Sequence, residues 1–97
     1  MNTLGQILRE YREAKSLLLR QAASLEMDTA LLSKFERDKR KPNKEQVLVF
    51  AKYYNANADE LLLAWLSDKI AEEVKDENLA QEALKAAEKK VELLKRK

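Results

Sequence analysis

The chain has 97 residues with one glycine, one proline and 45% hydrophobic residues, a composition that predicts a single all-helical domain with a modest core. Histidine and cysteine are both absent, which removes the commonest general base, nucleophile and zinc ligands, so we expect no enzyme, no metal site and no cofactor. The net charge of +2 is unevenly distributed: residues 33–44 hold six Lys and Arg, whereas residues 57–82 hold eight acidic side chains. This separation fits a protein that turns one side toward a polyanion.

A first helix is predicted to begin after Thr3, because Thr3 and Gln6 have the spacing of a capping box. It should end near Lys15 or Ser16. One face of this helix carries apolar residues at three- and four-residue spacing: Leu4, Ile7, Leu8, Tyr11 and Ala14. We expect that face to pack on the core.

A second, short helix is predicted over residues 17–25, with Leu17, Leu19, Ala22 and Ala23 as core contacts. The two alanines are small enough to let another helix cross closely. Glu26 and Met27 should then form a tight connection. A short helix, a short turn and a second capped helix describe a helix-turn-helix unit.

The central stretch, residues 28–42, reads D-T-A-L-L-S-K-F-E-R-D-K-R-K-P. Asp28 is the predicted N-cap of a third helix, in which Leu32 and Phe35 share one face and Leu31 flanks them. Small or hydrogen-bonding residues make up another face: Thr29, Ala30, Ser33 and Lys34. A cationic run follows and ends at Pro42: Arg37, Lys39, Arg40 and Lys41. Such a helix suits a DNA groove flanked by phosphates; the alternative is a solvated amphipathic helix with a charged loop.

Asn43 is the predicted cap of a fourth helix over residues 44–54, and Asn55 is a suitable left-handed stop. The residues expected to face inward are Val47, Leu48, Phe50, Ala51 and Tyr54. Asn57 with Glu60 repeats the capping-box spacing and should open a fifth helix. The apolar residues of that helix cover more than one stripe: Leu61, Leu62, Ala64, Trp65, Leu66, Ile70, Ala71 and Val74. The surplus predicts a second contact beyond the domain.

Residues 76–78 should interrupt the helical structure or provide an N-cap before a last helix over residues 79–97. The apolar stripe of this helix has little left to cover it within its own domain. Packing on the fifth helix is one possibility, and we favour a partner-helix or dimer surface. The residues predicted for that surface are Trp65, Ile70, Val74, Ala80, Ala83, Leu84, Ala87, Val91 and Leu94. We therefore divide the chain into residues 1–66, the DNA-binding domain, and residues 67–97, a helical extension for dimerisation.

Residues 4–66 resemble the helix-turn-helix domain of the XRE-like family, typified by phage repressor and Cro proteins. Three strings carry the resemblance: L-G-Q-I-L-R-E-Y-R, D-T-A-L-L-S-K-F-E-R-D-K-R-K-P and V-L-V-F-A-K-Y-Y-N-A-N-A-D-E-L-L. The runs D-T-A-L-L-S-K and L-L-A-W-L-S-D-K-I also resemble small regulators that accompany DNA methyltransferases in restriction–modification clusters. The resemblance implies a five-helix, repressor-like domain followed here by one extra helix.

By position, the resemblance makes residues 29–37 the recognition helix, with Thr29, Ala30, Ser33 and Lys34 facing base edges. It implies that Arg12 and Glu36 form a structural ion pair. The residues expected to contact phosphate are Arg20, Gln21, Arg37, Lys39, Arg40, Lys41 and Lys44. The sequence departs from the family in two places: the second helix is one residue short, and it starts on Leu18 and Leu19 without the usual Thr or Ser cap. Which residue of 19–21 faces DNA therefore stays open.

These observations predict a sequence-specific, cytoplasmic DNA-binding regulator that acts as a homodimer on an inverted repeat. No apolar run reaches membrane-spanning length, and the N-terminal M-N-T-L-G-Q lacks the layout of a signal peptide. The alternative is an antitoxin-like or other protein-binding module whose C-terminal helices cover a partner protein.

Overall fold

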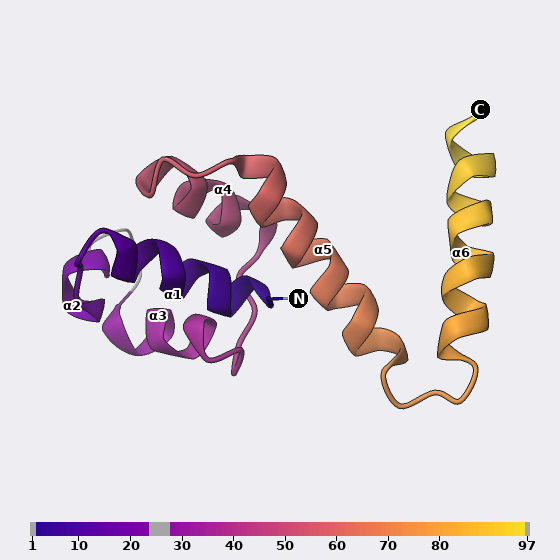
Figure 1. Cartoon of the computed structure of the whole chain (residues 1–97), viewed down its shortest axis with the longest axis horizontal. Coiled ribbons are helices and arrows are strands. Elements are labelled where there is room, and N and C mark those ends of the chain that lie inside the picture. Colours follow the sequence, from indigo (N-terminus) through magenta and orange to yellow (C-terminus); the bar gives the residue numbers. More distant parts are fainter. Residues whose placement is uncertain (1, 24–27, 97) are drawn as a thin grey trace.

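The computed structural model describes residues 2–23 and 28–96, and within them the only regular secondary structure is helical (Figure 1). The six helices are α1 (Leu4–Ala14), α2 (Leu19–Ala22), α3 (Thr29–Glu36), α4 (Lys44–Tyr53), α5 (Ala58–Val74) and α6 (Ala80–Lys95). Helices α1 to α4 and the first half of α5 form a compact body, from which the second half of α5 and all of α6 project. The predicted all-α fold, with five helices and one more at the C-terminus, is confirmed.

Polar side chains begin four of the helices as predicted. Thr3 Oγ1 accepts from Gln6 N at 3.2 Å while Gln6 Oε1 accepts from Thr3 N at 2.9 Å, which is the expected capping box. Asp28 Oδ1 accepts from the backbone of α3, and Asn43 caps α4. Asn57 caps α5 but without a reciprocal Glu60 bond, because the Glu60 carboxylate accepts from Tyr11 Oη at 2.6 Å instead. The capping box predicted there is therefore only half formed.

Three helices are followed, two residues after their last helical residue, by a residue with left-handed backbone, and none of the three is glycine. These residues are Ser16 (φ 56°), Asp38 (φ 57°) and Asn55 (φ 51°). In each case the backbone N–H of that residue and of the next one bond back to the last turn, which is the Schellman arrangement. The predicted left-handed stop at Asn55 is confirmed.

Helix α2 is shorter than the predicted span of residues 17–25. It begins at Leu19, because Leu18 is extended and the Leu17 carbonyl accepts from Arg12 Nη1 at 2.7 Å. It ends at Ala22, and Leu25, Glu26 and Met27 lie outside the described residues. The predicted core contacts are correct, since Ala22 is buried and Leu17, Leu19 and Ala23 pack against the core.

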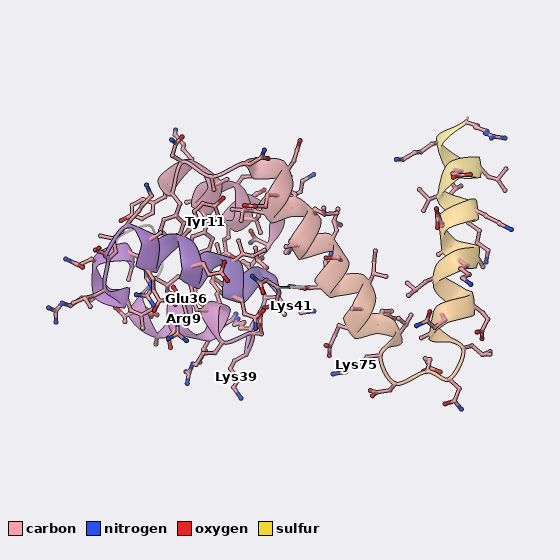
Figure 2. The ribbon with its side chains drawn as sticks, in the orientation of Figure 1. Arg9, Tyr11, Glu36, Lys39, Lys41 and Lys75 are labelled. Carbon is pink, nitrogen blue, oxygen red and sulfur yellow. The ribbon has the colours of Figure 1, made fainter. Side chains whose placement is uncertain are left out.

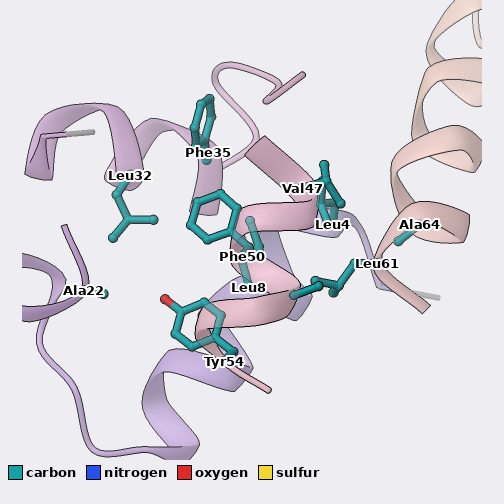
Figure 3. Packing of buried hydrophobic residues seen from close by; sticks show 11 residues of the cluster. Leu4, Leu8, Ala22, Leu32, Phe35, Val47, Phe50, Tyr54, Leu61 and Ala64 are labelled. Atoms are coloured by element: carbon teal, nitrogen blue, oxygen red, sulfur yellow. The ribbon is translucent and has the colours of Figure 1, made fainter. Parts of the chain in front are cut away.

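The core lies where α1, α3, α4 and α5 meet (Figure 3). Its buried apolar residues are Leu4, Leu8, Ala22, Leu32, Phe35, Val47, Phe50, Ala51, Tyr54, Leu61 and Ala64. The rings of Phe50 and Tyr54 stack at 6.1 Å between centroids, and Phe35 meets Phe50 edge-on at 6.2 Å. These contacts fix the back of α3 against α4.

Two of the residues predicted to face inward do not. Leu48 is 42% exposed, because the buried face of α4 follows Val47, Phe50 and Ala51 and Leu48 lies about 100° away from Val47 on the helix. Ala14 is exposed as well, since it is the last residue of α1 and the core contacts of that helix stop before it.

Gly5 is the one position of α1 where a side chain does not fit. A Cβ built there would lie 2.5 Å from Asp38 Oδ1 and 2.9 Å from the Glu36 carbonyl oxygen, and would overlap the Phe35 carbonyl oxygen. The backbone at the end of α3 therefore lies directly against that of α1. In addition, Gly5 N donates to the side-chain Oδ1 of Asp38 at 3.3 Å.

Replacing Gly5 by alanine is expected to lower the free energy of unfolding by about 1–3 kcal/mol, the usual range for an overpacked site. Helix propensity alone predicts a gain of about 1 kcal/mol for this substitution, so the sign separates the two effects. Urea unfolding followed by far-UV circular dichroism measures it. A stabilised Gly5→Ala variant would show that α1 and α3 do not approach as closely as described.

Tyr54 carries a buried hydroxyl with no hydrogen-bond partner among the described residues, and its side chain is 1% exposed. Burial raises its pKa from 10.0 to about 12, with the Glu36 carboxylate adding to the effect. In the unfolded chain the phenol ionises near its ordinary pKa, so the stability that this group contributes is complete below pH 10. It is then lost as the pH rises toward 12.

The free energy of unfolding is therefore expected to fall between pH 10 and about 12, by on the order of 2 kcal/mol. Because strong alkali also affects other parts of the chain, the unmodified protein is compared with Tyr54→Phe. This variant keeps the ring stack, and its free energy of unfolding should lack the part of the fall that Tyr54 causes. Urea unfolding at a series of pH values measures both proteins. If the two curves stay parallel up to pH 12, Tyr54 is not the responsible group.

Candidate nucleic-acid interface

Helix α3 separates the residues predicted for its two faces. Leu32, Phe35 and Glu36 are buried. On the opposite side Thr29, Ala30 and Lys34 are exposed, and Ser33 is half-buried. The face predicted to read bases is thus open to solvent, and its residues are small except for one lysine. A helix with such a face can approach the base edges of a major groove closely.

The ion pair that the family resemblance implied is present and joins α1 to α3. Arg12 Nε donates to Glu36 Oε2 at 2.8 Å and Arg12 Nη2 to Glu36 Oε1 at 2.9 Å, which is a bidentate geometry. Both side chains are at most one-tenth exposed. The bond to Glu36 raises the pKa of Arg12, which keeps the guanidinium charged. Arg12 also donates to the Leu17 carbonyl, and so a single guanidinium ties α1 to α3 and to the residues that lead into α2.

The loop after α3 exposes its cations to solvent and bonds its carboxylate to the start of α1. Asp38 takes the left-handed backbone, accepts from Thr3 Oγ1 at 2.7 Å and accepts from Gly5 N at 3.3 Å. The exposed cations of this stretch are Arg37, Lys39, Arg40 and Lys41. Figure 2 shows Lys39 directed away from the body. Asp38 therefore holds the loop on α1, and the four exposed cations lie on either side of it in the sequence.

A second set of bonds holds the far end of the loop on α5. Trp65 Nε1 donates to the Pro42 carbonyl at 2.8 Å, and Lys41 Nζ approaches the Asp68 carbonyl at 3.4 Å. The Asp68 carboxylate in turn accepts from Leu4 N at 2.8 Å. The loop is therefore fixed at both ends, by Asp38 to α1 and by Pro42 to α5.

The remaining residues predicted to contact phosphate lie on α2 and α4. Arg20 and Lys44 are exposed, Lys44 as the first residue of α4. Gln21 Oε1 accepts from Leu18 N at 2.7 Å, so its oxygen caps α2 in place of the missing Thr or Ser. Among these three, Arg20 and Lys44 have charged ends that face solvent.

The residues predicted for the dimer surface lie on α5 and α6, and Trp65 is set apart from the others. Trp65 is half-buried in the domain's own fold, where its indole bonds to Pro42 and Lys69 Nζ lies 4.4 Å from its ring centroid. Ile70, Val74, Ala83, Leu84 and Ala87 line a groove between α5 and α6. Val91 and Leu94 lie further along α6 and are exposed, and Ala80 is half-buried at its start.

Two contributions to the site were not predicted. The inward bonds of Asp38 and the Trp65–Pro42 bond both join residues more than twenty positions apart, and no local pattern signals them. Gly5 offered a weak signal, because the single glycine of the chain lies inside a predicted helix, where glycine is unfavourable unless space requires it.

Residues 3–65 match a protein-family model described as a helix-turn-helix domain, and the chain belongs to that family. This family indicates a DNA-binding regulator. Comparison with the curated proteins found no match. Within the described ranges, no helix is long and apolar enough to cross a membrane, and no group of histidine, cysteine or acidic residues there could hold a metal ion.

Proposed function

We propose that this chain is a sequence-specific DNA-binding regulator of the XRE-like type, which binds an inverted-repeat operator as a homodimer. One observation carries the proposal: α3 presents an uncovered face of small and hydrogen-bonding residues beside a loop whose cations are exposed to solvent. Thr29, Ala30, Ser33 and Lys34 would read base edges. Lys34 would donate to guanine O6 or N7, and the methyl groups of Thr29 and Ala30 would contact thymine.

In this proposal the cations around α3 bind phosphates and set the register of the helix on the duplex. They are Arg20, Arg37, Lys39, Arg40, Lys41 and Lys44, with Gln21 beside them. Two recognition helices related by a two-fold axis would enter successive major grooves about 34 Å apart. Such a regulator would act in the cytoplasm, where it would block or assist polymerase at a promoter.

Selection of bound duplexes from random DNA tests the proposal. A symmetric motif with two half-sites is expected for the unmodified chain. For Lys34→Ala we expect the same symmetry with relaxed preference at one position of each half-site, and a loss of about 1–3 kcal/mol in specific binding. Recovery of no motif, or of a motif that Lys34→Ala leaves unchanged at every position, contradicts the assignment of α3 as the reading helix.

The exposed apolar groove between α5 and α6 favours a second candidate, a protein-binding module of the antitoxin-like kind. In that case the C-terminal helices cover a different protein, and DNA binding serves autoregulation or is absent. Light scattering of the purified chain separates the two candidates. A clean homodimer favours the regulator, and a monomer or an aggregate that a partner protein rescues favours the module.

A further inference from the structure

Helix α6 makes little use of its apolar residues within its own chain. It has no buried residue, and Leu84, Val91 and Leu94 are 41%, 48% and 64% exposed. These three residues recur at spacings that place them on one face, together with Ala83 and Ala87. In Figure 1, α6 stands away from α5, and the two helices form an open V joined by a short turn.

The inside of this V is an apolar groove of about 400 Å³. Helix α5 contributes Leu66, Lys69, Ile70, Glu73 and Val74 to its lining, and α6 contributes Ala83, Leu84 and Ala87. The α5 wall carries three large branched side chains and one charge of each sign, whereas the α6 wall is mostly alanine. Small residues on one wall let a third helix approach closely, as in the core of a helical bundle.

The distribution of charge along α6 and the turn before it indicates which partner would occupy the groove. The segment around the turn, residues 72–82, carries five carboxylates and one lysine. The far half of α6, residues 88–96, carries four cations and two carboxylates. A parallel pair of α6 helices would bring like charges together at both ends. An antiparallel pair brings the basic end of each α6 onto the acidic turn of the other, where opposite charges meet twice.

We propose that a second copy of this chain fills the groove, with the two α6 helices antiparallel and each seated between α5 and α6 of its partner. This inference rests on the homodimer of the proposed function and specifies its geometry. Val91 and Leu94 of one chain then pack against the alanine-rich first half of the other α6. The four helices form a small bundle about the two-fold axis.

The bundle would orient the DNA-binding surface directly, because α5 is continuous from core to groove. Its first half buries Leu61 and Ala64 in the core, and its middle accepts or donates bonds to the loop through the Asp68 carbonyl and the Trp65 indole. Its second half lines the groove. One unbroken helix thus links the two-fold axis to the phosphate-binding loop, and the angle between paired α5 helices would set the spacing of the two recognition helices.

The test is sedimentation equilibrium of the full chain without DNA, at about 0.05 M ionic strength where surface charges are weakly screened. The unmodified chain is expected to dimerise. Lys95→Glu with Arg96→Glu should weaken the dimer roughly tenfold or more, and so should Asp76→Lys with Glu77→Lys, because each places like charges in contact. An equimolar mixture of the two variants should recover the unmodified affinity. Lys15→Glu with Lys52→Glu, which reverses two exposed charges outside both segments, is the control.

Orientation is read from cross-linking, since the chain has no cysteine of its own. Gln81→Cys and Lys95→Cys place thiols at opposite ends of α6 on exposed positions. An antiparallel pair is expected to form the mixed disulfide between the two variants in preference to either variant with itself. Preferential self-linking by both variants, a monomeric chain, or charge variants no weaker than the control each overturn the proposal.

These outcomes are separate from the test of DNA binding. A chain that selects a DNA motif but stays monomeric, or pairs in parallel, keeps its DNA-binding role and loses this geometry. A chain that dimerises with the stated orientation and selects no motif supports the geometry and removes the regulator.

Discussion

Replacing Arg12 by alanine is expected to lower the free energy of unfolding by about 3–5 kcal/mol, the range found when one partner of a buried ion pair is removed. The cost arises because the Glu36 carboxylate, whose side chain is 4% exposed, would remain buried with its charge uncompensated. The Leu17 carbonyl would lose its guanidinium donor at the same time. Urea unfolding of the single variant measures the effect.

The same helix supplies a matched control. Arg9 lies one turn before Arg12 and pairs with Glu13 at 3.5 Å, but both of these side chains are more than half exposed. Arg9→Ala should therefore cost no more than about 0.5 kcal/mol, as exposed pairs of this spacing do. If Arg12→Ala and Arg9→Ala cost the same, the Arg12–Glu36 pair does not hold α1 on α3.

A double variant shows what the pair contributes beyond filling space. Arg12→Met with Glu36→Met removes both charges together, so no uncompensated charge remains, and this variant should be more stable than either single alanine variant. DNA binding should nevertheless weaken in the double variant, because the bidentate geometry that orients α3 is lost. The pair would then serve the placement of the recognition helix more than the stability of the domain.

Local signals in the sequence predicted where most helices begin. They did not predict the hydrogen bonds that side chains form between helices. The caps at Thr3, Asp28 and Asn43 follow from hydrogen bonds that reach only three residues, so the residue types alone define them. Glu60 has the same spacing from Asn57, yet its carboxylate bonds to Tyr11, forty-nine residues away. A contact of that kind depends on how α1 and α5 pack against each other. The spacing of apolar residues along each helix does not specify that packing.

The same limit explains what was wrong about α2 and what was missed in the loop. The second helix was predicted to begin at Leu17. Instead the Leu17 carbonyl accepts from the Arg12 guanidinium, and the first helical turn begins at Leu19. The Arg12–Glu36 pair was predicted through the family resemblance rather than from any pattern, since twenty-four residues separate the two. Nothing in the sequence placed Asp38 against α1, although its bonds there hold the loop that carries the exposed cations.

Removing both Lys39 and Arg40 is expected to weaken binding to every duplex alike. Both side chains are exposed, and neither takes part in a salt bridge within residues 2–23 and 28–96. Each phosphate contact releases counterions, so the slope of log K against log salt should flatten by about one unit for each of the two cations lost. Gel-shift titrations from about 0.05 to 0.2 M salt, on a selected and on a random duplex, measure the slope.

Lys52→Ala is the control for net charge, because Lys52 is also exposed, lies in the last turn of α4 and is outside the cationic stretch of residues 33–44. It should leave the slope unchanged. Lys34→Ala should differ from both, since loss of a base contact lowers affinity for the selected duplex more than for the random one. The pattern expected is therefore a flattened slope without loss of preference for the loop variant, and loss of preference for Lys34→Ala. An unchanged slope for the loop variant would remove Lys39 and Arg40 from the interface, because two exposed cations that touch phosphate must displace counterions.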